Sequence, residues 1–164
     1  MNTKLPPPIP QALLGDWIDP KGNVSRYGAD GINYAVDIRE FKIIDDVVLN
    51  WGNQQYQRIA GKGGLLGVWE MEDRPGEWEK ITLGVNGYYG YDSFDNLVLG
   101  GSYFVNSNIL STSETRSPFR VEGNCIHIID GNQNPAIMTF VIDGDTLTLS
   151  SNGKITVLKR VKLY

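Results

Sequence analysis

Short segments rich in β-branched and aromatic residues, each ended by a glycine-containing turn, fill most of this chain. In the second half a turn signal recurs at nearly every eighth to twelfth residue, which is the spacing of a β-sandwich or β-barrel. Asparagine or aspartate followed by glycine supplies the positive φ that tight hairpins require. Such pairs occur at Asn86-Gly87, Asp130-Gly131, Asp143-Gly144 and Asn152-Gly153. The pattern therefore predicts an all-β protein.

Composition supports one globular domain with at most a small appended module. The 164 residues include 41% hydrophobic and 21% charged residues, which are ordinary globular values. The longest stretch without glycine or proline, Ile32 to Trp51, alternates like a strand, although residues 37–42 also suit a short helix. On residues 137–142 both alternating faces are mostly apolar, which predicts a strand covered on both sides.

Charge and cysteine content narrow the functional classes. A net charge of −4 and scattered cations argue against nucleic acid as a partner. No stretch of about 18 apolar residues exists to span a membrane, and the first residues lack a signal peptide's apolar core. The single cysteine, Cys125, rules out an internal disulfide framework. We expect a soluble cytoplasmic protein, and a mature secreted chain would have the same features.

A repeated pentapeptide suggests two units. Leu13-Leu14-Gly15-Asp16-Trp17 matches Leu65-Leu66-Gly67-Val68-Trp69, and each copy is followed far downstream by an apolar-x-Arg-aliphatic segment ending at Ile59 or Val161. We predict a Pro-rich extended arm over residues 1–12, a β-meander of about four strands over 13–60, and a β-barrel over 61–164. Ala60-Gly61-Lys62-Gly63-Gly64 is the expected hinge between the two units.

Residues 65–161 resemble a lipocalin-like domain of the calycin superfamily. The resemblance lies in Gly67-Val68-Trp69, the Asn86-Gly87 hairpin, the segment from Asp143 to Leu149, and the closing Leu158-Lys159-Arg160-Val161. It implies an antiparallel up-and-down barrel preceded by the small β-meander module. In that superfamily the tryptophan plugs one end of the barrel and a C-terminal arginine lies across its ring.

The resemblance implies two tryptophan–arginine pairs. Trp69 would pair with Arg160 in the barrel, and Trp17 with Arg58 in the meander. An indole at a barrel end exposes a π face, and an overlying guanidinium adds about 0.5–2 kcal/mol of cation–π attraction. These four residues are the predicted structural set.

The candidate ligand-binding residues are tyrosines and two cationic or polar groups. Alternation places Tyr89 and Tyr91 on one strand face and Tyr88 on the other, and Tyr103 follows in a later strand. Phenol rings combine an apolar body with a hydrogen-bonding tip, which suits a small-molecule pocket or ordinary core packing. Arg116 is a candidate for a ligand carboxylate or a rim salt bridge, and His127 for a polar interior group.

Other chemistry receives less support. Cys125 and His127 share a strand face, but residues two apart on a strand lie about 6.5–7 Å apart, so the spacing alone does not make a nucleophile and base. One histidine and one cysteine are too few for zinc, and no phosphate-binding loop or dinucleotide fingerprint occurs, so no metal or cofactor is expected.

The sequence thus favours a non-catalytic protein that binds a small apolar or aromatic ligand in the barrel. The alternative is a protein–protein interaction module or assembly subunit, including a homo-oligomer, with a filled barrel. A third hypothesis is a barrel isomerase or lyase that uses His127 or Glu114 as acid or base.

Overall fold

The computed structural model describes residues 8–129 and 135–162, and these form antiparallel β-sheet with two short 3-10 helices. The helices are η1 (Gln11–Leu13) and η2 (Val85–Gly87). The strands are β1 (Gly15–Ile18), β2 (Val24–Tyr27), β3 (Ile32–Ile44), β4 (Val48–Trp51), β5 (Gln54–Ala60), β6 (Gly67–Arg74), β7 (Glu77–Leu83), β8 (Tyr88–Ser93), β9 (Val98–Asn106), β10 (Ile109–Ser113), β11 (Ser117–Glu122), β12 (Cys125–Ile129), β13 (Pro135–Asp143), β14 (Thr146–Ser151) and β15 (Lys154–Arg160). The expected all-β class is confirmed. Among the described helices, none has the length and apolar character needed to cross a membrane.

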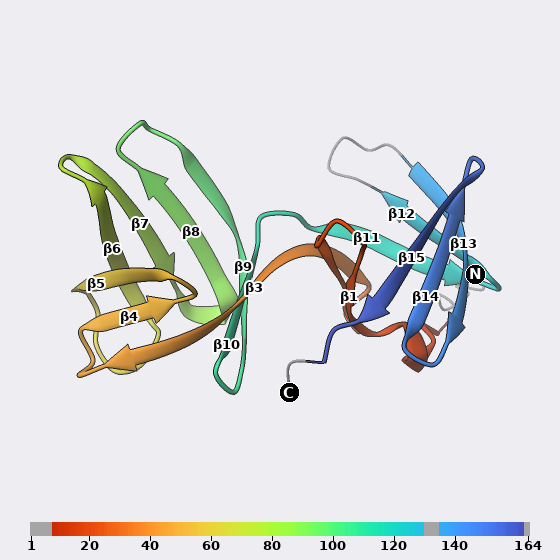
Figure 1. Ribbon diagram of the computed structural model, residues 1–164, viewed down its shortest axis with the longest axis horizontal. Coiled ribbons are helices and arrows are strands. Elements are labelled where there is room, and N and C mark those ends of the chain that lie inside the picture. Colours follow the sequence, from red (N-terminus) through yellow and green to blue (C-terminus); the bar gives the residue numbers. More distant parts are fainter. Residues whose placement is uncertain (1–7, 130–134, 163–164) are drawn as a thin grey trace, which may run out of the picture. The chain divides into compact units, whose positions relative to one another are not determined.

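The strands close into two rings that share β3 (Figure 1). One ring, here called the inserted ring, runs from the second part of β3 through β4 to β10 and closes by pairing β10 with β3. The other, the split ring, consists of β1, β2, the first part of β3 and β11 to β15, and closes by pairing β15 with β1. Each ring therefore has eight strands, and neighbouring strands are antiparallel.

The chain's order explains the two names. Of the described residues, the split ring takes those up to Val36 and those from Thr115 onward, while the inserted ring takes Asp37–Glu114. In Figure 1 the split ring therefore combines the red and blue ends of the colour scale, and the inserted ring is orange to green. This division differs from the predicted boundaries of 13–60 and 61–164, since the two ends of the chain build one unit and its middle builds the other. Residues 1–7 of the predicted arm lie outside the described residues.

Strand β3 settles the ambiguity in the longest uninterrupted segment. Residues 37–42 are strand rather than helix. Ile32 to Val36 pair with β2 and β11, and Asp37 to Ile44 pair with β10 and β4. Because a strand's side chains alternate between faces, the alternating pattern of this segment lets it serve both rings without interruption.

Each ring has its own hydrophobic core. In the split ring the buried set is Leu13, Trp17, Tyr27, Phe119, Val121, Ile126, Leu147 and Leu158. In the inserted ring it is Leu49, Trp51, Tyr56, Trp69, Ile81, Leu83, Tyr89 and Leu110. Most of these residues sit at alternate strand positions, so each core is the inward face of its own strands.

Strand β13 is not covered on both sides as predicted. Met138, Phe140 and Ile142 pack against the core of the split ring. Ile137 and Val141, on the opposite face, are 56% and 65% exposed. The hydrophobicity of a strand's two faces therefore does not show which face is buried, and this strand has an apolar outer face.

The glycine-rich segment 60–64 is a pinned loop within the inserted ring rather than a hinge between units. It connects β5 to β6, which pair with each other. The Asp46 carboxylate accepts hydrogen bonds from the Gly63 and Gly64 backbone N–H groups, at 3.1 Å and 3.2 Å for the shortest contacts. Because Gly63 and Gly64 have no side chains, their backbone N–H groups can approach the Asp46 carboxylate, and these hydrogen bonds hold the loop in place.

Strand for strand, the two rings share one arrangement. Starting from the strand that carries the Gly-x-Trp motif, β1 corresponds to β6, β2 to β7, the first part of β3 to β8, and β11 to β9. In the same order β12 corresponds to β10, β13 to the second part of β3, β14 to β4, and β15 to β5. The chain therefore enters the inserted ring at the strand equivalent to β13, so the second ring has the topology of the first in circularly permuted order.

Pairing registers support this correspondence residue by residue. Each of four register pairs in the split ring has its counterpart at the corresponding strands of the inserted ring. These are Trp17 with Arg160 and Trp69 with Arg58, Leu158 with Leu147 and Tyr56 with Leu49, Phe140 with Leu149 and Phe41 with Trp51, and Met138 with Ile126 and Arg39 with Leu110.

Candidate functional site

A buried tryptophan lies near one end of each ring, called here the Trp end. Trp17 and Trp69 are both 0% exposed. The Trp17 Nε1–H donates to the Leu13 carbonyl at 2.8 Å, and the Trp69 Nε1–H donates to the Leu65 carbonyl at 3.0 Å. In both repeats the acceptor is the first leucine of Leu-Leu-Gly-x-Trp, so the matching sequence produces matching geometry.

Glycine is required two residues before each tryptophan. Gly15 and Gly67 have φ of 116° and 145°, which L side chains rarely adopt. At Gly67 a Cβ would lie 2.3 Å from the Ala60 carbonyl oxygen, which is closer than any real contact. The Gly-x-Trp spacing thus has a steric cause, because the backbone two residues before the indole needs a positive φ and leaves no room for a Cβ atom.

An arginine lies over each indole, but the pairs are the reverse of those predicted. The Arg160 guanidinium is 4.2 Å from the Trp17 ring centroid, and that of Arg58 is 4.1 Å from the Trp69 centroid. The predicted pairing of Trp69 with Arg160, and of Trp17 with Arg58, is therefore wrong. The reason is strand pairing: β15 lies beside β1, and β5 lies beside β6.

Both arginines also bind backbone carbonyls of their own ring. Arg160 donates to the Ala12 and Leu14 carbonyls at 2.6 Å and 2.9 Å. Arg58 donates to the corresponding Gly64 and Leu66 carbonyls, the latter at 2.8 Å. A guanidinium presents several donors in a fixed plane, so one residue can cover the indole and satisfy two carbonyls.

An aspartate from a β-turn completes each Trp end. Asp145 contacts Arg160 at 3.3 Å, and Asp46 contacts Arg58 at 3.0 Å. The pKa of Asp46 is lowered, mainly by hydrogen bonds from the Gly63 and Gly64 amides and then by Arg58. The pKa of Asp145 is lowered, first by Lys162 and then by Arg160. At each Trp end the indole, the guanidinium and the carboxylate are therefore held together by a cation–π contact and an ion pair.

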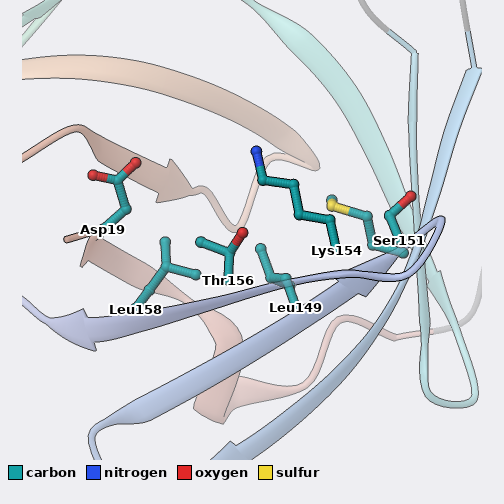
Figure 2. A pocket seen from close by; sticks show the side chains of 7 residues that line it. Asp19, Leu149, Ser151, Lys154, Thr156 and Leu158 are labelled. Carbon is teal, nitrogen blue, oxygen red and sulfur yellow. The ribbon is translucent and has the colours of Figure 1, made fainter. Parts of the chain in front are cut away.

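The far end of the split ring contains a cavity of about 290 Å³ (Figure 2). Leu149, Thr156 and Leu158 project from β14 and β15 into it. Its full lining is Asp19, Met138, Leu149, Ser151, Lys154, Thr156 and Leu158. Met138, Leu149 and Leu158 belong to the core of the split ring or pack against it, so the cavity lies on the inward face of the strands. An apolar floor below a few polar groups is the usual composition of a small-molecule site.

The corresponding space in the inserted ring holds larger, bonded side chains. By strand register, Met138 corresponds to Arg39 and Leu149 to Trp51. In the same way Thr156 corresponds to Gln54 and Leu158 to Tyr56. The Arg39 guanidinium lies 4.3 Å from the Trp51 ring centroid and donates to Gln54 Oε1 at 2.7 Å. The Tyr56 hydroxyl donates to the same oxygen at 3.0 Å. Four side chains that leave a cavity in one ring are replaced by a connected network in the other.

The three predicted ligand-binding tyrosines lie together in the inserted ring. Tyr89 is in its core, and Tyr91 and Tyr103 pack against that core. Tyr88 is 53% exposed, which confirms the predicted alternation. Burial raises the pKa of Tyr56 to about 12, and burial with a hydrogen bond to Glu79 raises the pKa of Tyr91 to about 12. The Tyr103 hydroxyl donates to the Gly84 carbonyl at 2.9 Å.

The two remaining predicted residues belong to the split ring, so the five are not one cluster. Arg116 is exposed in the segment between β10 and β11. His127 alternates with Ile126 and Ile128 of the core, so it points away from the interior. Its Nε2 lies 3.6 Å from a carboxylate oxygen of Glu122. Glu114, the other candidate acid or base, belongs to the inserted ring.

Sequence reasoning missed all the residues that line the cavity. Asp19 begins the turn after β1, Lys154 follows the Asn152-Gly153 turn, and Leu149 and Thr156 alternate like the residues of any strand. A second hollow of about 320 Å³ at the Trp end of the inserted ring is lined by loop residues such as Gly61, Lys62 and Leu66 and, in equal number, by residues of β6 and β7. Within residues 8–129 and 135–162, no group of three or more His, Cys, Asp or Glu is placed to hold a metal ion.

The comparisons with known proteins add no assignment to this geometry. No protein-family model, no curated protein sequence and no solved structure shows a significant match to this chain.

Proposed function

We propose that this chain is a lipocalin-like, non-catalytic protein that binds a small, largely apolar ligand inside the split ring. The observation that carries the proposal is the cavity of about 290 Å³ between Met138, Leu149 and Leu158. Ligand pockets typically measure about 300–1,000 Å³, so this one is at the lower limit and suits a compact ligand.

The eight-stranded ring and its Trp end support the lipocalin-like assignment. The indole of Trp17 is buried near one end of the ring and Arg160 covers it, which favours ligand entry from the other end. The cavity is on that other side, next to the turns that follow β1 and β14. A rigid closed end with a chamber beyond it is an arrangement suited to binding rather than to chemistry.

Binding of N-phenyl-1-naphthylamine, a neutral dye that fluoresces in apolar sites, tests the proposal. Leu149→Trp copies the residue that the inserted ring has at this position and should fill the cavity, weakening dye binding about tenfold or more. Ile155→Trp is the matched control, because Ile155 is 67% exposed on the adjacent strand and faces outward.

The expected result is saturable binding to the unaltered chain and to Ile155→Trp, with loss in Leu149→Trp. Circular dichroism checks that each variant retains its fold. Equal binding by all three proteins would show that the dye binds elsewhere, and absence of saturable binding to the unaltered chain would also contradict the proposal.

A second candidate function is protein docking, favoured by the outer face of β13 and β15. Ile137, Val141, Ile155 and Val157 are between 42% and 67% exposed there. Thr148 of β14 lies between Val141 and Val157 in register, so this face has apolar side chains without an intervening charge. Exposed apolar faces of this kind often mark interaction sites. Sedimentation velocity of the chain and of Val141→Glu would reveal self-association that the added charge removes.

A further inference from the structure

Two opposite charges border the cavity of the split ring. Asp19 follows β1, and Lys154 begins β15. Figure 2 shows the Asp19 carboxylate and the Lys154 amino group beside the space into which Leu149, Thr156 and Leu158 project. The cavity therefore has an apolar floor and a border that carries both signs of charge.

The Asp19 carboxylate is held in place by its own turn. Its Oδ1 accepts the backbone N–H groups of Lys21 and Asn23, each at 2.9 Å, and Oδ2 accepts the Asn23 side-chain amide at 3.2 Å. The pKa of Asp19 is lowered, chiefly by the Asn23 backbone hydrogen bond, so the group is an anion at neutral pH. A carboxylate has about four acceptor positions, and donors from the described residues occupy three of them, so Asp19 can accept another donor.

Lys154 is a cation without a partner in the described part of the chain. No ion pair or hydrogen bond joins its amino group to another described residue. Ser151 and Thr156 line the cavity beside it. The Ser151 hydroxyl donates to the Ile137 carbonyl at 3.3 Å, so a ligand anion here would receive the Lys154 ammonium group and the Thr156 hydroxyl.

The size of the cavity limits the ligand's body. At about 290 Å³ the space suits a compact group rather than a long chain. A ligand with only an anionic end would face the Asp19 carboxylate, and one with only a cationic end would face Lys154. A ligand with both charges matches the border, because each charge meets its opposite.

We propose that the split ring binds a compact zwitterion with an apolar side chain, of the α-amino acid type, with its ammonium group at Asp19 and its carboxylate at Lys154. The side chain then lies against Leu149, Leu158 and Met138. This inference rests on the proposed function, since it requires that the cavity holds a ligand.

Calorimetric titration of the full chain with L-phenylalanine and two analogues tests the inference. N-acetyl-L-phenylalanine lacks the ammonium group, and L-phenylalaninamide lacks the carboxylate. L-phenylalanine should bind, and each analogue should bind about tenfold or more weakly, because each leaves one charge of the site unpaired.

Variants assign each charge to its partner. Asp19→Asn keeps a turn-forming side chain and should weaken L-phenylalanine and the amide, while leaving the N-acetyl analogue unchanged. Lys154→Gln should weaken L-phenylalanine and the N-acetyl analogue but leave the amide unchanged, and Lys154→Arg should restore binding. Lys159→Gln is the control, because Lys159 belongs to the same strand as Lys154 but does not line the cavity.

The outcomes separate this inference from the proposed function. Binding of N-phenyl-1-naphthylamine without binding of L-phenylalanine would overturn the zwitterion and leave the apolar site intact. Equal affinity for L-phenylalanine and its N-acetyl analogue would also overturn it, in favour of a simple anion site. If neither the dye nor the amino acid binds, both proposals fail.

Discussion

The two rings have the same Trp end and different interiors at the opposite end. In both, a glycine with positive φ precedes a buried tryptophan that an arginine covers and a turn aspartate supports. At the other end, Met138 and Leu149 border a cavity, whereas Arg39 and Trp51 stack on each other. The comparison teaches that two rings with the same Trp end can differ at a few inward positions, and that these positions decide whether the ring has room for a ligand.

The permuted order of the inserted ring follows from the same comparison. A closed ring has no edge strand. The first strand in chain order can therefore be any strand of the ring, and every strand still pairs with the same two neighbours. The chain can therefore enter such a ring at any strand, provided that the Trp end forms. Here it enters one ring at the Gly-x-Trp strand and the other at the strand equivalent to β13.

The largest expected effect is on stability, from removal of either indole. Trp17→Ala and Trp69→Ala should each lower the free energy of unfolding by about 3–5 kcal/mol, since both side chains are fully buried. Urea denaturation followed by circular dichroism measures both values. A small loss in one variant beside a large loss in the other would break the equivalence of the Trp ends.

Replacing inward-facing residues of the inserted ring by those of the split ring should have the next largest effect on stability. Arg39→Met with Trp51→Leu gives the inserted ring the residues of the split ring, and should cost about 2–4 kcal/mol through lost packing. The same variant should gain a second site for N-phenyl-1-naphthylamine. A stoichiometry that stays unchanged would show that these two positions do not control the available space.

Removal of the arginines should cost less and should distinguish the two Trp ends. Arg58→Met and Arg160→Met each lose a cation–π contact and leave backbone carbonyls without a donor, which we expect to cost about 1–3 kcal/mol. The Arg58 side chain is 6% exposed and that of Arg160 is 24% exposed, so the loss should be greater at Arg58. Chemical denaturation of both variants measures the difference, and the reverse order would contradict this account.

The turn aspartates should give the smallest effect, and it should depend on pH. The pKa of Asp46 and that of Asp145 are both lowered from 3.8 in the folded protein. Each carboxylate therefore stabilises the fold above the unfolded pKa, and its contribution is lost as pH falls through the lower folded pKa. Asp46→Asn and Asp145→Asn should lower Tm slightly at pH 7, and the difference should shrink as the pH falls below 3.8. A difference that persists in acid would exclude charge as its cause.

Local patterns in the sequence predicted the strands, but they did not predict which distant strands pair to close each ring. Tight turns such as Asn86-Gly87 indicate hairpins, and alternation in residues 137–142 indicates a strand. Both signals act within a few residues. The pairing of Trp17 with Arg160 joins the two ends of the chain, and no local pattern states which of two arginines reaches which tryptophan. The short connection between Arg58 and Trp69 was the available signal, since neighbouring strands usually pair.

The candidate site was less predictable for a related reason. Alternation correctly placed Tyr89 and Tyr91 on one face, and that face is the interior of the inserted ring. Whether an interior is filled depends on the combined volume of residues from several strands. Leu149 and Thr156 appear ordinary in the sequence, and they border a cavity only because β13 and β15 bring no larger side chain beside them.

Double-mutant cycles on the two tryptophans and two arginines test the central claim, that two separate rings each close with their own pair. Trp→Leu and Arg→Met variants, made singly and together, give a coupling energy for each combination. We predict about 0.5–2 kcal/mol for Trp17 with Arg160 and for Trp69 with Arg58, and a value near zero for the two crossed combinations. Coupling between Trp69 and Arg160, with none between Trp69 and Arg58, would contradict the account.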